Sequence, residues 1–278
     1  MRILAKSDIG KLRDMNQDSY YVSDLENDDI KLYILADGMG GYKGGEIASS
    51  LAIANVRNFI VNNFKQVKKD RANILKLLRE AIEYANMIVY ERSLENEEFH
   101  DMGTTLDVCL IYNNKVFIGH VGDSRVYRIR KNIIRKLTTD HSYVEKLVKE
   151  GTITKEEAYN HPKKNMLMKA LGCNSLVEPD VICKGFLKDD ILLMCSDGLT
   201  NMLRDSEIYN LLLKNPENPV EALIKSANEV GGYDNVTVVI IDNIEVTNNN
   251  IKKDNININY DLRKGRRISH ESYRKNVK

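Results

Sequence analysis

Four aspartates in this chain each end an apolar run, and three of them are followed directly by Gly or Asn. Asp37 closes KLYILAD, Asp123 lies in FIGHVGDSR, Asp197 closes ILLMCSD, and Asp234 precedes Asn235 in GGYDN. An apolar run ending in a carboxylate is typical of a buried strand that brings an oxygen ligand to the sheet edge. A neighbouring Gly or Asn lets the backbone turn close to a bound ion. Because Mg²⁺ and Mn²⁺ prefer oxygen ligands, the set predicts a metal-dependent hydrolase.

Each aspartate alone also fits a plainer structure. Asp-Gly is a common turn dipeptide, so any one of these residues could simply follow a core strand. The same pattern occurs four times between Asp37 and Asp234, and this repetition favours a shared site.

A second polar motif, RDMNQD, spans residues 13–18 and precedes an expected strand. Arg13 is a candidate phosphate clamp, because a planar guanidinium donates two hydrogen bonds to phosphate oxygens and keeps its charge. The alternative is an ordinary surface arginine in a polar loop. The aspartates elsewhere in the chain favour the clamp.

Composition excludes several classes of function. The 278 residues are 42% hydrophobic and 29% charged with a formal net charge of +1, which is typical of a globular protein and gives no reason to expect nucleic acid or an anionic membrane as partner. The N-terminus lacks the apolar region of a signal peptide, and no apolar stretch is long enough to cross a membrane, so we expect a cytoplasmic protein without membrane insertion. The cysteines show no C-x-x-C pairing and read as ordinary thiols.

Hydrophobic periodicity predicts strands in hairpins and helices in pairs. Asn113-Asn114 and Lys131-Asn132 stand at hairpin-turn positions. We expect strands over 2–7, 19–23, 30–36, 106–112, 115–121, 125–131, 132–137, 181–185, 191–196 and 236–242, and helices over 45–63, 72–93, 141–158 (broken at Gly151), 205–213 and 219–230. This grouping suits packed antiparallel sheets with helices outside and not a parallel doubly wound sheet.

The composition changes after Asp242. The last 36 residues are rich in Asn and carry nine Lys or Arg against four Asp or Glu. We therefore expect a catalytic domain over 1–242 and a basic, disordered tail over 243–278.

An ordered series of motifs resembles the metal-dependent protein phosphatases of the protein phosphatase 2C type, and among them the compact bacterial enzymes that oppose Ser/Thr kinases. The resemblance covers about residues 1–242. Its motifs are RDMNQD (13–18), DGMGG (37–41), MGTT (102–105), GHVGDSR (119–125), LTTDHS (137–142), KALG (169–172), CSDGL (195–199) and GGYDN (231–235).

The resemblance implies an α+β fold, a four-layer αββα sandwich of two antiparallel sheets flanked by helix pairs, with two Mn²⁺ or Mg²⁺ ions in a cleft at one end. Asp37 would bridge both ions and the carbonyl of Gly38 would bind one of them. Asp197 and Asp234 would hold the other ion. Asp123, with Asp197, would match a possible third ion.

The resemblance also implies the reaction. Asp18 would orient a water, Arg13 would hold the substrate phosphate, and Asn235 would support Asp234. A water bridging the ions would attack phosphorus while the Ser or Thr oxygen departs. The expected substrates are phosphorylated proteins, the expected partner is a Ser/Thr protein kinase with its substrates, and we expect a monomer.

Some positions depart from the family pattern or have no assigned role. Met39 stands where many eukaryotic members carry a His that protonates the leaving group, so the proton donor is unnamed. Lys169 replaces a common Arg. We expect a structural hydrogen bond from His141 and expect residues 142–162 to form a flap that shapes substrate access.

Three other functions stay open at this stage. GMGGYKGGE has Lys43 where a dinucleotide fingerprint needs its third Gly, which disfavours nucleotide binding. A pseudophosphatase that binds phosphoproteins without turnover is disfavoured by the complete set of aspartates. An enzyme of the same fold that hydrolyses small phosphate esters fits the motifs as well.

Overall fold

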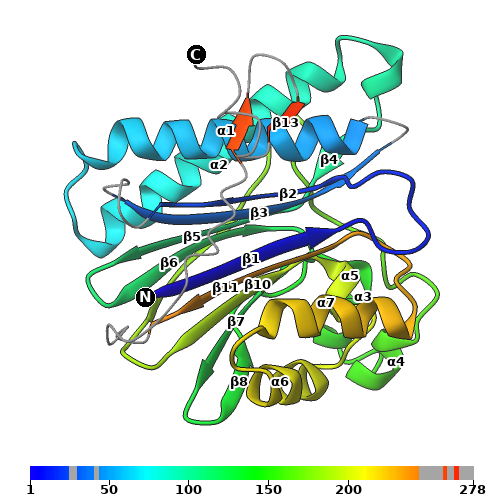
Figure 1. Cartoon of the computed structure of the whole chain (residues 1–278). Helices are drawn as coiled ribbons and strands as arrows, with labels where there is room; N and C mark the ends of the chain where they lie inside the picture. Colours follow the sequence, from blue (N-terminus) through cyan, green and yellow to red (C-terminus); the bar gives the residue numbers. More distant parts are fainter. Residues whose placement is uncertain (25–29, 41–43, 244–258, 262–265, 269–278) are drawn as a thin grey trace, which may run out of the picture. The chain divides into compact units, whose positions relative to one another are not determined.

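Two antiparallel β-sheets lie face to face in the unit that spans Met1–Glu245 of this computed structural model (Figure 1). The structure describes residues 1–24, 30–40, 44–243, 259–261 and 266–268. The first sheet has the strand order β1 (Arg2–Asp8), β11 (Val236–Asp242), β10 (Ile191–Cys195), β7 (Arg125–Arg130), β8 (Ile133–Lys136). The second has the order β2 (Asp18–Val22), β3 (Lys31–Met39), β5 (Leu106–Tyr112), β6 (Lys115–Val121), β9 (Asp180–Gly185), and β4 (Gly103–Thr104) pairs with β3.

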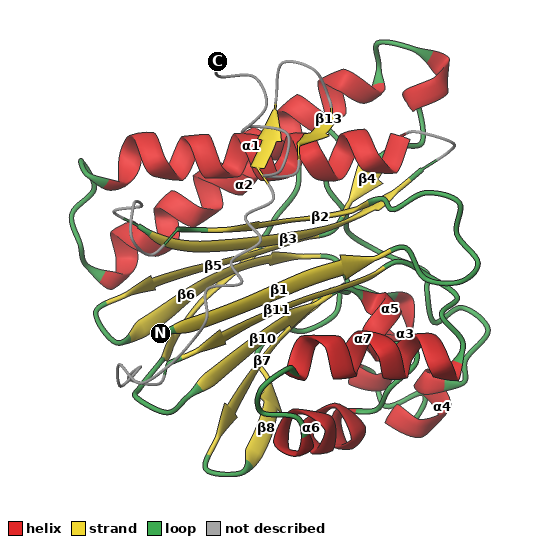
Figure 2. Cartoon of the chain, viewed as in Figure 1, coloured by secondary structure: helices red, strands yellow, loops and turns green. Residues whose placement is uncertain are grey.

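Helices cover the outer faces of both sheets (Figure 2). The long pair α1 (Gly44–Phe64) and α2 (Arg71–Ser93) packs on the second sheet, and the short helix η1 (Glu97–Phe99) follows α2. On the first sheet lie α5 (Asp197–Thr200), α6 (Asp205–Lys214) and α7 (Pro219–Val230). The helices α3 (Tyr143–Lys149) and α4 (Lys155–Tyr159) belong to the connection between β8 and β9. The expected αββα sandwich is confirmed.

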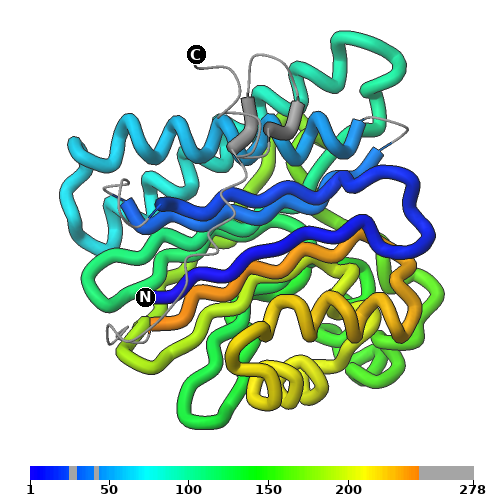
Figure 3. Tube along the Cα trace, in the orientation of Figure 1, coloured from blue at the N-terminus to red at the C-terminus, as the bar shows by residue number. Residues whose placement is uncertain are grey.

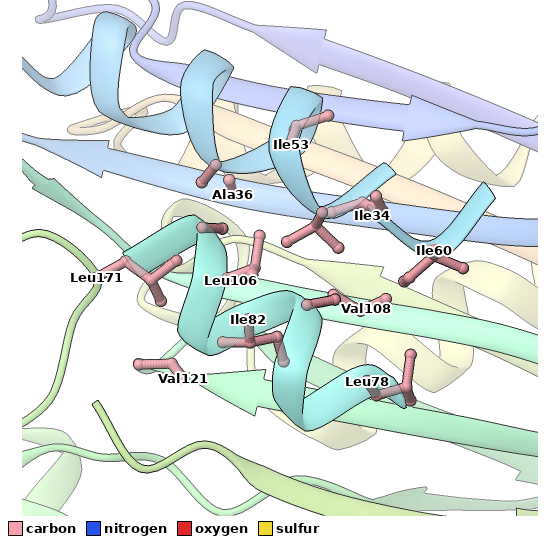
Figure 4. Close-up of a cluster of buried hydrophobic side chains, with 14 of the residues drawn as sticks. Ile34, Ala36, Ile53, Ile60, Leu78, Ile82, Leu106, Val108, Val121 and Leu171 are labelled. Carbon is pink, nitrogen blue, oxygen red and sulfur yellow. The ribbon is translucent and has the colours of Figure 1, made fainter. Parts of the chain in front are cut away.

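Side chains of the central strands alternate between the two faces of each sheet, and this alternation forms three apolar layers. In β3, Leu32, Ile34 and Ala36 pack against α1 and α2 (Figure 4), whereas Tyr33 and Leu35 pack between the sheets. Because successive side chains of a strand point to opposite faces, a strand buried on both sides reads as one continuous apolar run. This is why the strand predictions succeeded in the middle of the chain.

Both predicted hairpin turns have the backbone that tight hairpins require. Asn113 and Asn114 have φ values of 52° and 56°, and Lys131 and Asn132 have 47° and 61°. Two consecutive positive φ values define a type I′ turn, whose twist matches the flanking strands. These turns join β5 to β6 and β7 to β8.

Segments from the two ends of the unit lie side by side in the first sheet (Figure 3). Strand β1 pairs with β11 along its whole length, from Arg2 opposite Asp242 to Asp8 opposite Val236. The loops that follow β1 and precede β11 therefore emerge together at one end of the sheet. That end carries two of the predicted motifs.

The expected helix over 141–158 is two helices. Ser142 caps α3 and Thr154 caps α4 through a capping box with Glu157, and Gly151 lies between them with a φ of 72°. No helix among the described residues is long and apolar enough to span a membrane.

The second unit, Val246–Lys278, contains the short antiparallel pair β12 (Asn259–Asp261) and β13 (Arg266–Ile268). The sequence did not predict this pair. The assignment of 243–278 as a disordered tail, and the domain boundary before it, stay predictions.

Candidate active site

The residues to which the sequence assigned a catalytic, substrate-binding or metal-binding role converge on one cleft of about 210 Å³ at the end of the sandwich. Asp18 is the exception, because it lies buried beneath the cleft and does not line it. The lining residues are Arg13, Gln17, Asp37, Gly38, Met39, Gly40, Thr105, Asp123, Asn165, Leu167, Asp197 and Asp234.

Asp37 does not end its strand, which corrects the sequence interpretation. Strand β3 continues to Met39, and Gly38 and Met39 pair with β4. The register places Asp18, the first residue of β2, directly opposite Asp37. Two carboxylate residues therefore stand side by side on neighbouring strands, a pairing that destabilises a sheet unless a cation compensates it.

Gly38 is required by the close approach of two other segments. A Cβ atom at this position would lie 2.1 Å from the carbonyl oxygen of Gly45 and 2.6 Å from that of Gln17. No side chain fits such distances, so only glycine allows α1 and the 9–17 loop to close around the end of β3.

Asp197 lies at the start of α5, where the sequence predicted only a turn after a strand. The Cβ of an alanine at Gly198 would be 2.0 Å from the carbonyl oxygen of Asn235, so α5 touches the loop that carries Asp234. The side chain of Asn201, one turn later, donates to Asp197 at 2.9 Å. Helix α5 thus fixes Asp197 beside the Asp234 loop.

Burial and mutual repulsion raise the pKa of three carboxyl groups of the cleft. Burial and then the charges of Asp18, Asp197, Asp123 and Asp234 hold the pKa of Asp37 well above its usual value. Burial and the charge of Asp197 do the same for the pKa of Asp123. Burial and the charge of Asp234 raise the pKa of Asp197 to about 7. Carboxyl groups so placed are stabilised by a cation that enters among them.

Two hydroxyl groups donate hydrogen bonds to the carboxylate of Asp18. Ser196 Oγ and Thr237 Oγ1 both donate to its Oδ2, at 2.8 and 2.6 Å. Burial raises the pKa of Asp18 to about 6, against the effect of these two hydrogen bonds. Its Oδ1 is buried and has no hydrogen-bond partner among the described residues. A buried carboxylate oxygen without a donor is costly, and a water in the cleft could supply one.

Arg13 lies at the rim, on the loop after β1. Its Nη2 donates to Asp234 Oδ2 at 2.9 Å, and about half of its side chain is exposed. Asn235 ties this loop to the Asp234 loop, because it accepts from Gln17 N and donates to the carbonyl oxygens of Ile9 and Met15. Arg13 therefore points into the cleft from a braced loop.

Two residues discussed from the sequence stand outside the cleft. His141 accepts a hydrogen bond from the backbone of Gly122 at 3.2 Å, and burial and the neighbouring His120 lower the pKa of His141 to about 4. Lys169 donates to the carbonyl oxygen of Glu178 at 3.3 Å. Both side chains make structural contacts here, whereas Met39 does line the cleft.

Sequence reasoning missed several neighbours of the cleft. Thr105 Oγ1 accepts from the backbone of Asp37 at 3.0 Å and lies 2.8 Å from Ser124 Oγ. Asn165 and Leu167 reach the cleft from the connection between α4 and β9. The Thr-Thr pair in MGTT is a signal for Thr105 that the sequence shows. Asn165 and Leu167 reach the cleft only through the folding of the connection between α4 and β9, which the sequence does not show.

The donor set fits hard divalent cations. No group of three or more His, Cys, Asp or Glu side chains within the described ranges is arranged to hold an ion unaided. An ion in the cleft would therefore use some backbone oxygens and water together with carboxylates, which is how Mg²⁺ and Mn²⁺ commonly bind. The mutually repelling carboxyl groups and the unpartnered Oδ1 of Asp18 agree with such a site.

The fold and the sequence are those of a family of phosphatases. The family model described as "Protein phosphatase 2C" matches residues 12–231. The chain therefore belongs to the protein phosphatase 2C family.

Individual relatives are bacterial phosphatases. The serine/threonine phosphatase stp of Listeria welshimeri is 36% identical over 242 residues, which cover 85% of this chain and 94% of that protein. The crystal structure of the Mycobacterium tuberculosis serine/threonine phosphatase PstP/Ppp matches with a TM-score of 0.77 and 35% identity, over 88% of this chain and 99% of that one. The catalytic domain of PstP in complex with two manganese ions matches with a TM-score of 0.76 and 34% identity, over 88% and 98%.

Proposed function

We propose that the cleft binds divalent cations together with a phosphoryl group, and that the chain hydrolyses phosphoserine and phosphothreonine in proteins through it. Family membership makes the chain a serine/threonine protein phosphatase, a phosphoric monoester hydrolase. The proposal adds the roles of its residues. The observation that carries it is the set of half-buried carboxyl groups at Asp37, Asp123 and Asp197, which line the cleft, repel one another and have no ion pair with any described cation.

In this proposal the aspartates of the cleft hold the cations. Asp37, with the carbonyl of Gly38, Asp197 and Asp234 would hold two Mn²⁺ or Mg²⁺ ions, and Asp123 with Asp197 would take part in a third site. Bound cations neutralise charge on phosphoryl oxygens and lower the pKa of water. The binding of two manganese ions by PstP supports this number.

The other residues position the substrate and the water. Arg13 would bind phosphoryl oxygens through its forked guanidinium, in exchange for or beside its contact with Asp234. Asp18 Oδ1 would accept a hydrogen bond from water, and Ser196 and Thr237 fix its orientation. Met39 cannot protonate the leaving oxygen, so that proton would come from water.

The substrate chemistry implies the partner. Phosphoserine and phosphothreonine are made by protein kinases, so a Ser/Thr kinase must supply the substrates of this enzyme. We propose a cytoplasmic monomer whose catalytic domain is residues 1–242, with the 142–162 segment as a flap beside the cleft. Arg204 braces this flap, because it pairs with Glu156 at 2.6 and 2.7 Å and lies over the ring of Tyr159.

The direct test is turnover of matched substrates by chelator-treated protein with and without added Mn²⁺. We expect phosphate release from phosphothreonine and phosphoserine peptides only when Mn²⁺ is present. Phosphotyrosine peptides and a small ester such as p-nitrophenyl phosphate should show at least about tenfold lower kcat/KM. Turnover that persists in chelator, or a preference for the small ester, would overturn the proposal.

A further inference from the structure

Three arginines crowd one edge of the first sheet, away from the cleft. Arg128 and Arg130 lie on β7, and Arg135 lies on the edge strand β8. Arg128 is directly opposite Arg135 in the pairing of the two strands. Arg128 and Arg130 lie with Val126 on one face of β7, the face that packs toward the second sheet. We name these three residues the arginine edge.

Two of the guanidinium groups share one acceptor. Arg128 Nη1 and Arg130 Nη2 donate to the carbonyl oxygen of Gly185, at 2.9 and 3.1 Å. Gly185 is the last residue of β9, so these arginines reach from the first sheet to the second. Arg130 also pairs with Asp190, through Nε at 2.6 Å and Nη2 at 2.5 Å. Of the three arginines, only Arg130 thus pairs with a carboxylate.

Arg128 and Arg135 have no carboxylate partner among the described residues. Arg128 Nε is buried without a hydrogen-bond acceptor. Burial and the charges of Arg130 and Arg135 lower the pKa of the Arg128 guanidinium, whereas the hydrogen bonds to Asp190 raise that of Arg130. Like charges directly opposite on neighbouring strands destabilise a sheet, and a buried donor without an acceptor adds to the cost. An anion with several acceptor oxygens would relieve both.

We propose that Arg128 and Arg135 bind a dianionic phosphoryl group, carried by a second phosphorylated residue of the protein substrate. A phosphoryl group brings nearly two negative charges and three acceptor oxygens, which matches two neighbouring guanidinium forks. The source in a phosphoprotein rests on the proposed function. Free phosphate has the same chemistry, and the experiment separates the two.

The distance from the cleft to Arg128 along β7 determines how far apart the two phosphates of a substrate must lie. Arg128 is five residues after Asp123, which at roughly 3.3 Å per residue places it at most ~17 Å away along the chain. An extended peptide covers this distance in about five or six residues. The preferred substrate would therefore carry its second phosphate at about that separation from the phosphate that is removed.

The experiment compares peptides with one phosphothreonine and with a second one four, six or eight residues away. Wild type should hydrolyse at least one doubly phosphorylated peptide with a KM at least tenfold lower than that of the single one. Arg128→Gln/Arg135→Gln should lose this preference and keep its kcat/KM on the single peptide within twofold. Arg71→Gln, which removes an exposed charge from the start of α2, should behave as wild type.

Arg135→Glu keeps the test interpretable if the double variant is unstable. Arg135 is exposed on an edge strand, so the fold tolerates the change, and the new carboxylate faces Arg128. This variant should also lose the preference, and inorganic phosphate should raise its melting temperature less than that of wild type.

Four outcomes decide the matter. A preference in wild type that both arginine variants lose supports the proposal. If no spacing gives a preference but phosphate stabilises wild type and not Arg135→Glu, the site takes free phosphate and the phosphoprotein source is wrong. If neither effect appears while wild type hydrolyses the single peptide, the arginine edge is not an anion site, although the proposed activity stands. Lack of turnover of the single peptide would instead refute the proposed function.

Discussion

The aspartates of the cleft and Asp190, at the far edge of the first sheet, have opposite surroundings. In the cleft, burial and neighbouring carboxylates raise the pKa of Asp37, Asp123 and Asp197. For Asp190, burial favours a higher pKa, but the hydrogen bonds from Arg130 lower it below the usual value. Asp190 is buried to 1% exposure and is held in a two-point ion pair.

Asp140, in the loop after β8, has surroundings like those of Asp190. Burial again favours a higher pKa, but Arg125 and Lys136 lower the pKa of Asp140 below its usual value. Both cations bind it within 3.0 Å. Asp190 and Asp140 thus have their cations in the chain, whereas Asp37, Asp123 and Asp197 have none among the described residues, which agrees with the proposed metal site. The following changes test this division.

The largest effect should come from Asp37→Asn or Asp197→Asn. Each keeps the shape of the side chain but removes the ligand charge, so kcat/KM on a phosphothreonine peptide with Mn²⁺ should fall at least about a thousandfold, or ~4 kcal/mol. The metal-free variants should be no less stable than wild type, because one of several mutually repelling carboxyl groups is gone. Near wild-type turnover in either variant would refute the assignment.

Arg13→Ala should have the next largest effect on turnover. Loss of a two-point phosphate contact in a partly dehydrated cleft costs roughly 2–4 kcal/mol in kcat/KM. Manganese affinity, measured by calorimetry, should stay within about tenfold of wild type. Unchanged kcat/KM on a phosphothreonine peptide would show that Arg13 does not contact the substrate.

Asp190→Asn should affect stability and leave the chemistry intact. Removing one partner of a buried ion pair leaves a poorly compensated charge, and the partial exposure of Arg130 reduces the cost to roughly 2–3 kcal/mol. Urea unfolding measures this loss. The kcat/KM on a singly phosphorylated peptide should remain within about twofold, and a large loss of turnover in folded protein would contradict the division.

His141 should make stability depend on pH below neutrality. Its pKa of about 4 lies below the ordinary 6.5, so the unfolded chain takes up a proton first as the pH falls. Stability is therefore full above pH 6.5 and decreases toward pH 4, by about 2 kcal/mol from this group between pH 7 and pH 5. His141→Gln, whose amide oxygen can still accept from Gly122, should show a shallower decrease. The exposed His100 serves as control, and His100→Gln should follow wild type.

The smallest effect should come from truncation near Glu245. All residues of the cleft and all three apolar clusters lie before this point. Activity on small phosphopeptides and the melting temperature should stay close to those of the full chain. A loss of activity or of melting temperature would move the domain boundary into the tail. The tail also contains Arg266-Arg267-Ile268-Ser269, a basic stretch before a serine that a kinase could modify.

The sequence predicted the layers of the fold and grouped four aspartates that line one cleft, since apolar runs and hairpin-turn dipeptides are local signals. It could not show that β3 continues past Asp37, because the pairing of Gly38 and Met39 with β4 depends on a two-residue strand far along the chain. Helix α5 was missed because four residues are too few for a periodic pattern.

The sequence also could not show which charged side chains have an oppositely charged partner. RVYRIRK places Arg128 and Arg130 two residues apart, but Asp190 lies 60 residues from the Arg130 that it pairs with. Nothing local indicates that Arg128 lacks a carboxylate partner. Asn165 and Leu167 likewise enter the cleft through the path of a long connection. Such features arise from tertiary structure alone.

The most direct test of the central claim is the melting temperature of chelator-treated protein as Mn²⁺ is added. If the carboxyl groups of the cleft await an external cation, 1 mM Mn²⁺ should raise the melting temperature of wild type by several degrees, because an ion that binds only the folded state stabilises it. Asp37→Asn should lose most of this shift, and Asp190→Asn should keep it from a lower starting temperature. An equal response of wild type and Asp37→Asn, or no response of wild type, would contradict the account.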